Sequence, residues 1–412
     1  MAKQSLGVWL YGTRIADIAD GKPGVVTCRY TPEALDVWAG GTPLLSCSLP
    51  LSSRPFKDAG VWFRGLLPEG RALQAMADAA RVPTFDTFGM LARFGRDVVG
   101  AAVIAAEPVE DRSGGIAPYD ADTLAGEVAD LDDRPLALHD DSELSLPGLQ
   151  NKLLLVALED GWGRPTGGRP STHILKAEDR RYPGLAEREA ACLHLARAVD
   201  LTPVDAWTET HANIACLVTS RFDRITDDNG TIVRLHQEDA CQALGINHEA
   251  NDRRGKYETH GGPSFAKIAG LLDRYAADPV RELEQLARAM AFTVAIGNAD
   301  AHGKNIAVVH DSPETIRLAP VYDTVPMLCW DRLPTRAAMA VNGRRELVLG
   351  APDTITVADL IAEARGWRLD EARAAEAVTH TLNDLAAAAG TLEIPREVVE
   401  LVTARCHHLL DP

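Results

Sequence analysis

The order of strand-like and helix-like segments constrains the fold of this chain more than any other feature. Up to about residue 236 the sequence is dominated by short apolar runs bounded by turn residues, with few helices between them. Beyond that point long segments repeat their apolar residues at helical spacing. Strands gathered in one part and helices in the other predict an α+β fold, and a length of 412 residues predicts two or three packed units.

The expected elements fall into four regions. In region 1–105 we expect strands at 8–11, 12–15, 25–30, 44–49 and 98–105, and helices at 57–80, interrupted at 66–70, and 85–94. Region 106–143 is rich in Asp and Glu with Pro and Gly between them, so we expect an exposed acidic connection. Region 144–225 should hold strands at 152–158, 172–176 and 216–219 around a helix at 184–199. Region 226–412 should be helical, mainly at 263–274, 280–297, 357–365, 369–388 and 396–409.

Composition excludes several classes of protein. The formal charge of −17 opposes broad contact with nucleic-acid backbones. The seven cysteines form no CxxC pair, so neither a disulfide framework nor a zinc knuckle is expected. There is no apolar run of about 18 residues for a membrane helix and no apolar core of a signal peptide. We therefore expect a reduced cytoplasmic protein that does not enter a membrane.

The segment Gly297–Asn305 carries the clearest chemistry. It is polar, lies between a predicted helix and a short apolar strand, and places Asn305 five residues after Asp300. This is the Asp-to-Asn spacing of the protein-kinase catalytic loop, where the Asp accepts the proton of the attacking hydroxyl and the Asn oxygen binds Mg²⁺. Asp323 follows 18 residues after Asn305, behind another short strand, as a second carboxylate for the metal.

Two earlier segments could bind phosphates. Ser145–Lys152 is a turn-prone loop that enters an apolar strand, and backbone N–H groups of such a loop can cover a nucleotide. Lys176 ends the next strand, where a lysine can hold α- and β-phosphates. Glu189 follows 13 residues later in a predicted helix and is a candidate partner of Lys176.

Together these segments resemble the HipA family of bacterial toxin kinases, over about 8–410. The resemblance rests on the following segments, in the family's order: 66–69, 94–101, 145–152, 172–176, 236–242, 297–305 and 322–323. It implies a two-lobed kinase-like fold with a β-rich N-terminal lobe and a mainly helical C-terminal lobe. It also implies a serine/threonine kinase that uses ATP and Mg²⁺.

The resemblance further implies partners. Family members pair with a small helix-turn-helix antitoxin, HipB-like, and reach operator DNA only through it. The implied protein substrate is an aminoacyl-tRNA synthetase, whose phosphorylation halts translation and favours persistence. Autophosphorylation of a serine in the phosphate loop is the implied off-switch.

Roles of single residues are carried over by position. Asp300 is the implied catalytic base, Asn305 and Asp323 hold the metal, and Ser145 is the implied autophosphorylation site. The implied ATP-binding residues are Pro147, Gly148, Leu149, Gln150, Asn151, Lys152, Lys176, Ser220, Arg221, Phe222, His302, Lys304, Asn305 and Asp323. Residues 220–222 correspond to the hinge beside adenine, where Ser220 replaces the Glu of a well-known member, which puts any side-chain contact there in doubt.

Three other functions stay open from the sequence. A phosphotransferase acting on a small molecule would use the same Asp300, Asn305 and Asp323, although region 1–105 is unnecessary for that chemistry. A non-catalytic kinase could act only as co-repressor with its antitoxin. Direct action on nucleic acid is disfavoured by the negative charge and by the lack of a basic helix.

Overall fold

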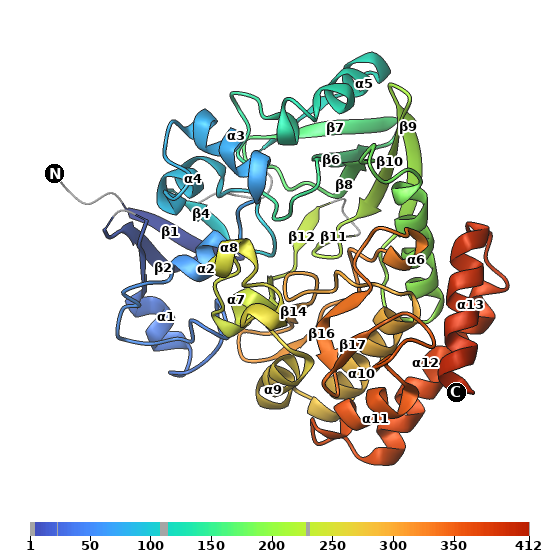
Figure 1. Cartoon of the computed structure of the whole chain (residues 1–412). Helices are drawn as coiled ribbons and strands as arrows, with labels where there is room; N and C mark the ends of the chain where they lie inside the picture. Colours follow the sequence, from blue (N-terminus) through green and yellow to red (C-terminus); the bar gives the residue numbers. More distant parts are fainter. Residues whose placement is uncertain (1–4, 23, 108–113, 228–230, 412) are drawn as a thin grey trace. The chain divides into compact units, whose positions relative to one another are not determined.

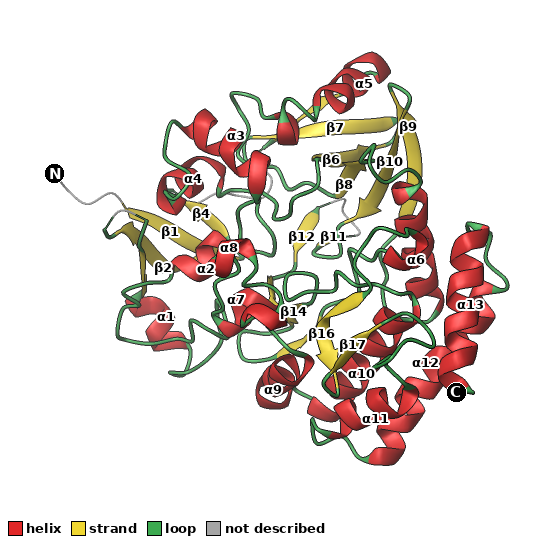
Figure 2. Cartoon of the chain, viewed as in Figure 1, coloured by secondary structure: helices red, strands yellow, loops and turns green. Residues whose placement is uncertain are grey.

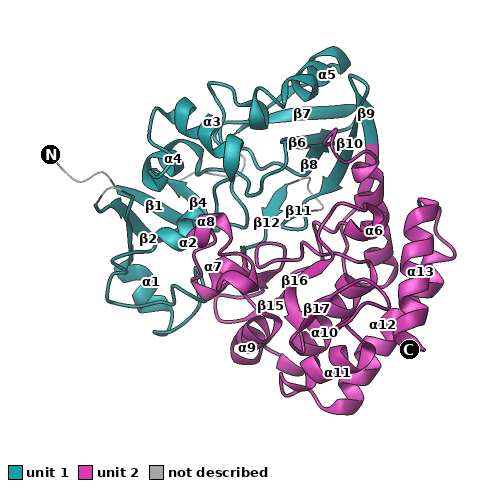
Figure 3. Cartoon of the chain, in the orientation of Figure 1, with its two compact units in different colours: residues 1–178, 209–238 teal, residues 179–208, 239–412 magenta. Residues whose placement is uncertain are grey.

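The chain folds into two compact units. A computed structural model describes residues 5–22, 24–107, 114–227 and 231–411. The first unit comprises Met1–Glu178 and Glu209–Glu238, and the second comprises Asp179–Thr208 and Asp239–Pro412 (Figure 3). Strands predominate in the first unit and helices in the second (Figure 2). The helix expected at 184–199 therefore groups with the later helices, although it lies between strands in the sequence.

The first unit begins with a four-stranded sheet of order β3-β2-β1-β4 and four helices (Figure 1). Their bounds are β1 (Ser5–Leu10), β2 (Thr13–Asp20), β3 (Val26–Tyr30), α1 (Pro32–Val37), α2 (Gly60–Arg64), α3 (Gly70–Ala80), α4 (Thr87–Phe94) and β4 (Val103–Ala105). Strands β1 and β2 form the predicted hairpin around Tyr11 and Gly12, which both have positive φ. Trp62, Phe63 and Phe94 are among the largest fully buried side chains and fill the core against this sheet.

The strand expected at Leu44–Leu49 is absent, and that prediction was wrong. The segment is irregular, although Leu44 and Leu45 are buried. One of its backbone N–H groups bonds to a side chain instead of a neighbouring strand. The carboxylate of Glu238 accepts hydrogen bonds from Ser46 Oγ at 2.6 Å and from the backbone N of Cys47 at 2.9 Å. A buried apolar run thus packs into the core without pairing in a sheet.

A second sheet of the first unit has six strands in the order β5-β7-β6-β8-β10-β9. The bounds are β5 (Gly115–Pro118), β6 (Lys152–Leu158), β7 (Gly161–Thr166), β8 (His173–Ala177), β9 (Ala206–His211) and β10 (Ile214–Ser220). The remaining elements are α5 (Ala121–Asp130), η1 (Pro135–Ala137), β11 (Arg224–Thr226), β12 (Ile232–Arg234) and β13 (Gln237–Asp239). Strand β8 lies between β6 and β10, so Lys176 is on a central strand.

Region 106–143 is more ordered than the expected acidic connection. Within its described part, β5 pairs with β7 and α5 follows directly. The Asp120 side chain accepts a hydrogen bond from the backbone N of Thr123 and so caps α5, while Leu124 and Val128 are buried. Asp120 caps this helix, Asp122 and Asp130 are exposed on it, and Glu127 is buried. Residues 108–113 of the expected connection lie outside the described residues.

The second unit is built mainly of helices. Their bounds are α6 (Leu185–Ala198), α7 (Ala240–Leu244), α8 (Ala250–Arg253), η2 (Glu258–His260), α9 (Phe265–Tyr275), α10 (Pro279–Ala295), η3 (Met327–Cys329), α11 (Val357–Arg365), α12 (Glu371–Ala389) and α13 (Arg396–Leu410). Four short strands accompany them: β14 (Ala307–His310), β15 (Ile316–Leu318), β16 (Arg336–Val341) and β17 (Arg344–Glu346). Helix α10 packs against α9, α11 and α12, and the five predicted long helices are confirmed. None of the helices in the described residues combines the length and apolarity needed to cross a membrane.

Candidate active site

The phosphate loop Ser145–Lys152 is fixed at its start. Ser145 is fully buried; its backbone N donates to the Asp97 carbonyl at 2.9 Å and its Oγ donates to the Leu66 carbonyl at 2.8 Å. The next side chain, Leu146, packs in a small apolar cluster with Leu144 and Leu154. The loop therefore leaves a rigid support, and the serine predicted to be phosphorylated points inward.

The tip of this loop folds back over its own lysine. Gly148 has a φ of +115°, and a Cβ at this position would lie 2.6 Å from Lys152 Nζ. Lys152 Nζ donates to the Pro147 carbonyl at 2.6 Å, and the Gly148 carbonyl accepts from the backbone N of Glu69 at 3.2 Å. Only glycine fits this turn without strain, because the conformation is left-handed and the space is occupied. Leu149 is 62% exposed at the tip.

Two lysines lie opposite each other beneath the loop. Lys152 in β6 and Lys176 in β8 are direct antiparallel partners, and both are buried. Directly opposed residues share one face of a sheet, and like charges in that arrangement repel. The contact of these two lysines with ATP phosphates stays a prediction.

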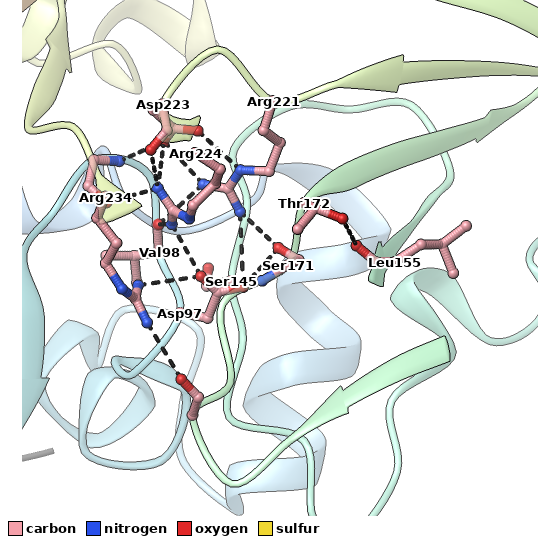
Figure 4. A network of polar contacts seen from close by, with 12 residues as sticks. Asp97, Val98, Ser145, Leu155, Ser171, Thr172, Arg221, Asp223, Arg224 and Arg234 are labelled. Carbon is pink, nitrogen blue, oxygen red and sulfur yellow. Dashed lines mark hydrogen bonds and ion pairs between the residues drawn. The ribbon is translucent and has the colours of Figure 1, made fainter. Parts of the chain in front are cut away.

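The predicted hinge residue Arg221 has its side chain in a buried ionic cluster (Figure 4). We define the ionic cluster as the two carboxylates and three guanidinium groups of residues Asp97, Asp223, Arg221, Arg224 and Arg234. Its members touch at 2.9 to 3.7 Å. The guanidinium of Arg221 therefore serves the fold, and a backbone contact of 220–222 with adenine stays a prediction.

The cluster holds its carboxylates ionised. Burial alone would raise the pKa of Asp97, but the guanidinium groups of Arg221, Arg224 and Arg234 outweigh burial and lower it. The pKa of Asp223 is likewise low, because Arg221 and Arg224 outweigh its burial. Since the Asp97 carbonyl also accepts from Ser145, the ionic cluster anchors the phosphate loop from below.

The predicted catalytic loop lies in the second unit, directly after α10. The backbone N of Asp300 donates to Asn298 Oδ1 at 3.0 Å, and the Asp300 carbonyl accepts from Asn305 Nδ2 at 3.0 Å and from the His302 backbone N at 2.7 Å. Asp300 and Asn305 are thereby held in one compact turn. With the Asn305 NH₂ group used in this way, Oδ1 is the amide atom able to bind a metal.

Asp323 is brought to the same loop. The Tyr322 hydroxyl donates to the Lys304 carbonyl at 2.8 Å, and Asp323 has a φ of +53°. A left-handed non-glycine residue is uncommon and tends to mark a functional position. Asn305 and Asp323 supply hard oxygen donors that fit Mg²⁺, the remaining ligands being phosphate oxygens and water. No group of three or more His, Cys, Asp or Glu side chains suited to a metal occurs in the described part of the chain.

Lys304 and His302 have surroundings that the sequence did not indicate. Lys304 is buried, and its Nζ lies 2.8 Å from Asp239 Oδ2 in the same unit. His302 is also buried, and burial, with a smaller contribution from Lys256, lowers its pKa to about 3. His302 is therefore neutral near neutral pH. The Asp323 carboxylate opposes this shift.

Tyr257 is the site residue that sequence reasoning missed. Its hydroxyl donates to Asp300 Oδ1 at 2.8 Å, and its ring meets the His302 ring edge-on with centroids 5.1 Å apart. The adjacent Lys256 carbonyl accepts from the Gly303 backbone N at 3.1 Å. The local sequence gives no signal for this contact, because Tyr257 lies in a polar turn 43 residues before Asp300.

The predicted site residues divide between the units. Asp300, His302, Lys304, Asn305 and Asp323 come together in the second unit. Residues 145–152, Lys176 and 220–222 belong to the first. Glu189 is buried in α6 of the second unit, so its pairing with Lys176 stays a prediction.

Two family descriptions match the chain. The HipA N-terminal domain matches residues 6–105, and the HipA-like C-terminal domain matches residues 144–389. A putative kinase of Sinorhizobium fredii, Y4mE, is 34% identical over 377 residues, which are 89% of this chain and 85% of that protein. The serine/threonine-protein kinase toxin HipA of Shewanella oneidensis is 26% identical over 307 residues, covering 72% of this chain and 70% of that protein.

A solved structure shows the same fold. The chain matches a structure of the Shewanella oneidensis MR-1 toxin–antitoxin complex of HipA, HipB and operator DNA with a TM-score of 0.79. Identity is 23%, and the match covers 98% of this chain and 97% of the other. The predicted α+β fold, two-lobed and kinase-like, is confirmed.

Proposed function

Since this chain belongs to the HipA family of kinases, we propose that it transfers the γ-phosphate of ATP to a serine or threonine hydroxyl of a protein. The observation that carries this proposal is the hydrogen-bonded loop of the second unit. In it Asn305 is tied to Asp300, and Tyr322 ties the segment of Asp323 to Lys304. These bonds support the proposed roles of Asp300 as proton acceptor and of Asn305 and Asp323 as oxygen donors for a metal.

Each residue has a defined task in the transfer. The acceptor oxygen bonds to the γ-phosphorus while the bond from that phosphorus to the bridging oxygen of ADP breaks, and Asp300 takes the hydroxyl proton. Lys152 and Lys176 offset phosphate charge in the nucleotide site. Mg²⁺ held by Asn305 and Asp323 would neutralise charge on the β- and γ-phosphates. Catalysis here is mainly positioning and charge neutralisation.

Mass spectrometry of the intact protein tests this proposal. Dephosphorylated protein is incubated with ATP and Mg²⁺, with and without purified aminoacyl-tRNA synthetases, beside Asp300→Asn. We expect phosphate on the wild type or on a synthetase, and far slower transfer with Asp300→Asn. Transfer to small alcohols but not to protein would favour the small-molecule phosphotransferase. No transfer by a folded wild type would refute the kinase proposal and favour a non-catalytic co-repressor.

Ser145 is the proposed site of self-inactivation. Its Oγ is buried and donates to the Leu66 carbonyl, so a phosphate could be added only after the loop leaves its place. The loop that opened in this way would no longer cover ATP, which would make the modification an off-switch. Peptide mapping of the wild-type product should find one phosphate on Ser145, and Ser145→Ala should gain none there.

The proposed partner is a small helix-turn-helix antitoxin, with DNA reached only through it. Support comes from the solved relative, which was obtained with HipB and operator DNA. The charge of −17 agrees with contact through a basic partner rather than directly. Purified chain alone should leave operator DNA unshifted in a gel, and adding the antitoxin should shift both proteins together.

A further inference from the structure

The hydrogen bond from Tyr257 to Asp300 deepens the proposed function and rests on it. Tyr257 Oη donates to Asp300 Oδ1 at 2.8 Å, within the second unit. Hydrogen bonds to a charged acceptor are the stronger kind, and one of this length constrains the orientation of both groups. Asp300 is the residue whose orientation matters most, since it must face the acceptor hydroxyl.

The phenol is itself held firmly. The Tyr257 backbone N donates to the Arg254 carbonyl at 2.9 Å, and the Tyr257 carbonyl accepts from the backbone N of His260 at 2.9 Å and of Gly262 at 3.0 Å. The neighbouring Glu258 carboxylate accepts from the Ala340 backbone N at 2.6 Å, which ties the turn to β16. Because this turn is fixed, the Tyr257 hydroxyl is held in a defined orientation towards Asp300.

The ring adds a second constraint. It meets the His302 ring edge-on, with an interplanar angle of 85°. His302 in turn accepts from the Lys304 backbone N at its Nδ1, 3.3 Å away, so the ring is part of the catalytic loop itself. Tyr257 thus contacts the loop through its hydroxyl at Asp300 and through its ring at His302.

We propose that Tyr257 is a positioning residue for the catalytic base. By engaging Oδ1 of Asp300 it limits rotation of the carboxylate that must face the acceptor hydroxyl. Tyr257 transfers no proton and touches no nucleotide. Its loss should therefore slow the chemical step without weakening ATP binding.

Tyr257→Phe removes only the hydroxyl and keeps the ring against His302. We expect kcat for phosphate transfer to fall about tenfold to a hundredfold, as for a lost hydrogen bond to a charged group. The KM for ATP should stay within about twofold of wild type. In an Asp300→Asn background the same change should cause no further loss, because it acts through that carboxylate.

Tyr119→Phe is a matched control in the first unit. The Tyr119 hydroxyl also donates to a carboxylate, that of Glu127, so the substitution deletes the same kind of bond away from the catalytic loop. Its kcat should equal that of wild type. The melting temperatures of both variants show whether either loss of activity reflects loss of fold.

Each remaining outcome counts against the proposal. A kcat of Tyr257→Phe within about twofold of wild type overturns it, since a positioning bond is worth more than that. So does a parallel rise in the KM for ATP, or an equal fall in kcat with Tyr119→Phe, because either shows a general structural effect. An additive loss in the Asp300→Asn background also overturns it. An inactive wild type refutes the kinase proposal first and the role of Tyr257 with it.

Discussion

Two aspartates show how differently the two units use a carboxylate. Asp97, in the first unit, is buried and accepts from Arg224 at 2.9 Å, from Arg234 at 3.2 Å and from the Ser171 hydroxyl at 2.6 Å. Asp300, in the second unit, is only partly buried, and its Oδ1 accepts from the Tyr257 hydroxyl at 2.8 Å. A carboxylate surrounded by cations stabilises a fold and is unsuited to accept a proton. A partly buried carboxylate oriented by a neutral hydroxyl can serve as a base.

The largest expected effect on stability is at Asp97. Asp97→Asn leaves the three arginines of the ionic cluster with Asp223 as the remaining carboxylate. Breaking a buried ionic network by removing one partner costs about 3–5 kcal/mol. For a unit of this size we expect the melting temperature to fall by roughly 10 °C, measured by circular dichroism. An unchanged melting temperature would show that the ionic cluster is not needed for the fold.

The reverse is expected at Asp300. Asp300→Asn should reduce phosphate transfer by about a hundredfold or more, as for loss of a general base. Its melting temperature should stay close to that of wild type, because the substitution keeps the shape of the side chain. Reduced activity together with a large loss of stability would remove the contrast with Asp97.

Acid should affect the stability of the two units over different pH ranges. Burial lowers the pKa of His302 to about 3. Below about pH 6.5 this histidine is therefore protonated in the unfolded chain but remains neutral in the folded second unit. Stability of that unit should fall by about 1.4 kcal/mol per pH unit from there down to about pH 3. Asp97 and Asp223 have lowered pKa values, so their contribution is complete above about pH 4 and is lost only below it.

Melting curves between pH 7 and pH 4 measure this difference. His302→Gln should flatten the fall in stability over that range, whatever its stability at pH 7. A slope equal to that of wild type would show that His302 does not set the acid sensitivity of the second unit.

A smaller effect is expected at the ion pair of Asp239 and Lys304. Asp239→Asn keeps the cap of α7, since Asn is as good an N-cap as Asp, but removes the charge 2.8 Å from Lys304 Nζ. We expect a loss of about 1–3 kcal/mol in unfolding free energy. Phosphate transfer should fall severalfold, because Lys304 precedes Asn305. Urea denaturation and the mass assay check the two expectations separately.

The smallest effect is expected at Arg396, whose side chain pairs with Glu400 one turn away on the exposed face of α13. Exposed pairs of this spacing contribute about 0.3–0.5 kcal/mol. Arg396→Ala should therefore leave both the melting temperature and phosphate transfer near those of wild type. A larger change would mean that this face of α13 contacts something in the assay.

Local pattern predicted the elements that depend on local interactions. The hairpin of β1 and β2 follows from alternating residues around Tyr11-Gly12, and α12 and α13 follow from helical spacing. The run Leu44–Leu49 failed because a strand also needs a neighbour, and its neighbour is the side chain of Glu238. The helix α5 was missed because its acidic residues outweighed the buried Leu124 and Val128 in our interpretation.

The candidate site likewise contains residues that the sequence predicted and residues that it could not predict. Asp300 and Asn305 could be found because their relation is contained in one short loop. Tyr257 could not, since folding alone brings it 2.8 Å from Asp300. The ionic cluster also joins distant parts of the chain, at 97, 221, 224 and 234, so the spacing of these residues in the sequence does not predict it.

The burial of Ser145 limits the rate at which this serine can be phosphorylated. A group enclosed by hydrogen bonds to Asp97 and Leu66 reacts only during a local opening of its segment. The rate of the proposed self-phosphorylation would then equal the fraction of molecules in which this segment is open multiplied by the rate constant of transfer. It would not depend on the ATP concentration once the nucleotide site is full. Each molecule would be inactivated independently of the others. A population of identical molecules would switch off one at a time with an exponential spread of active lifetimes, set by how firmly that one serine is enclosed.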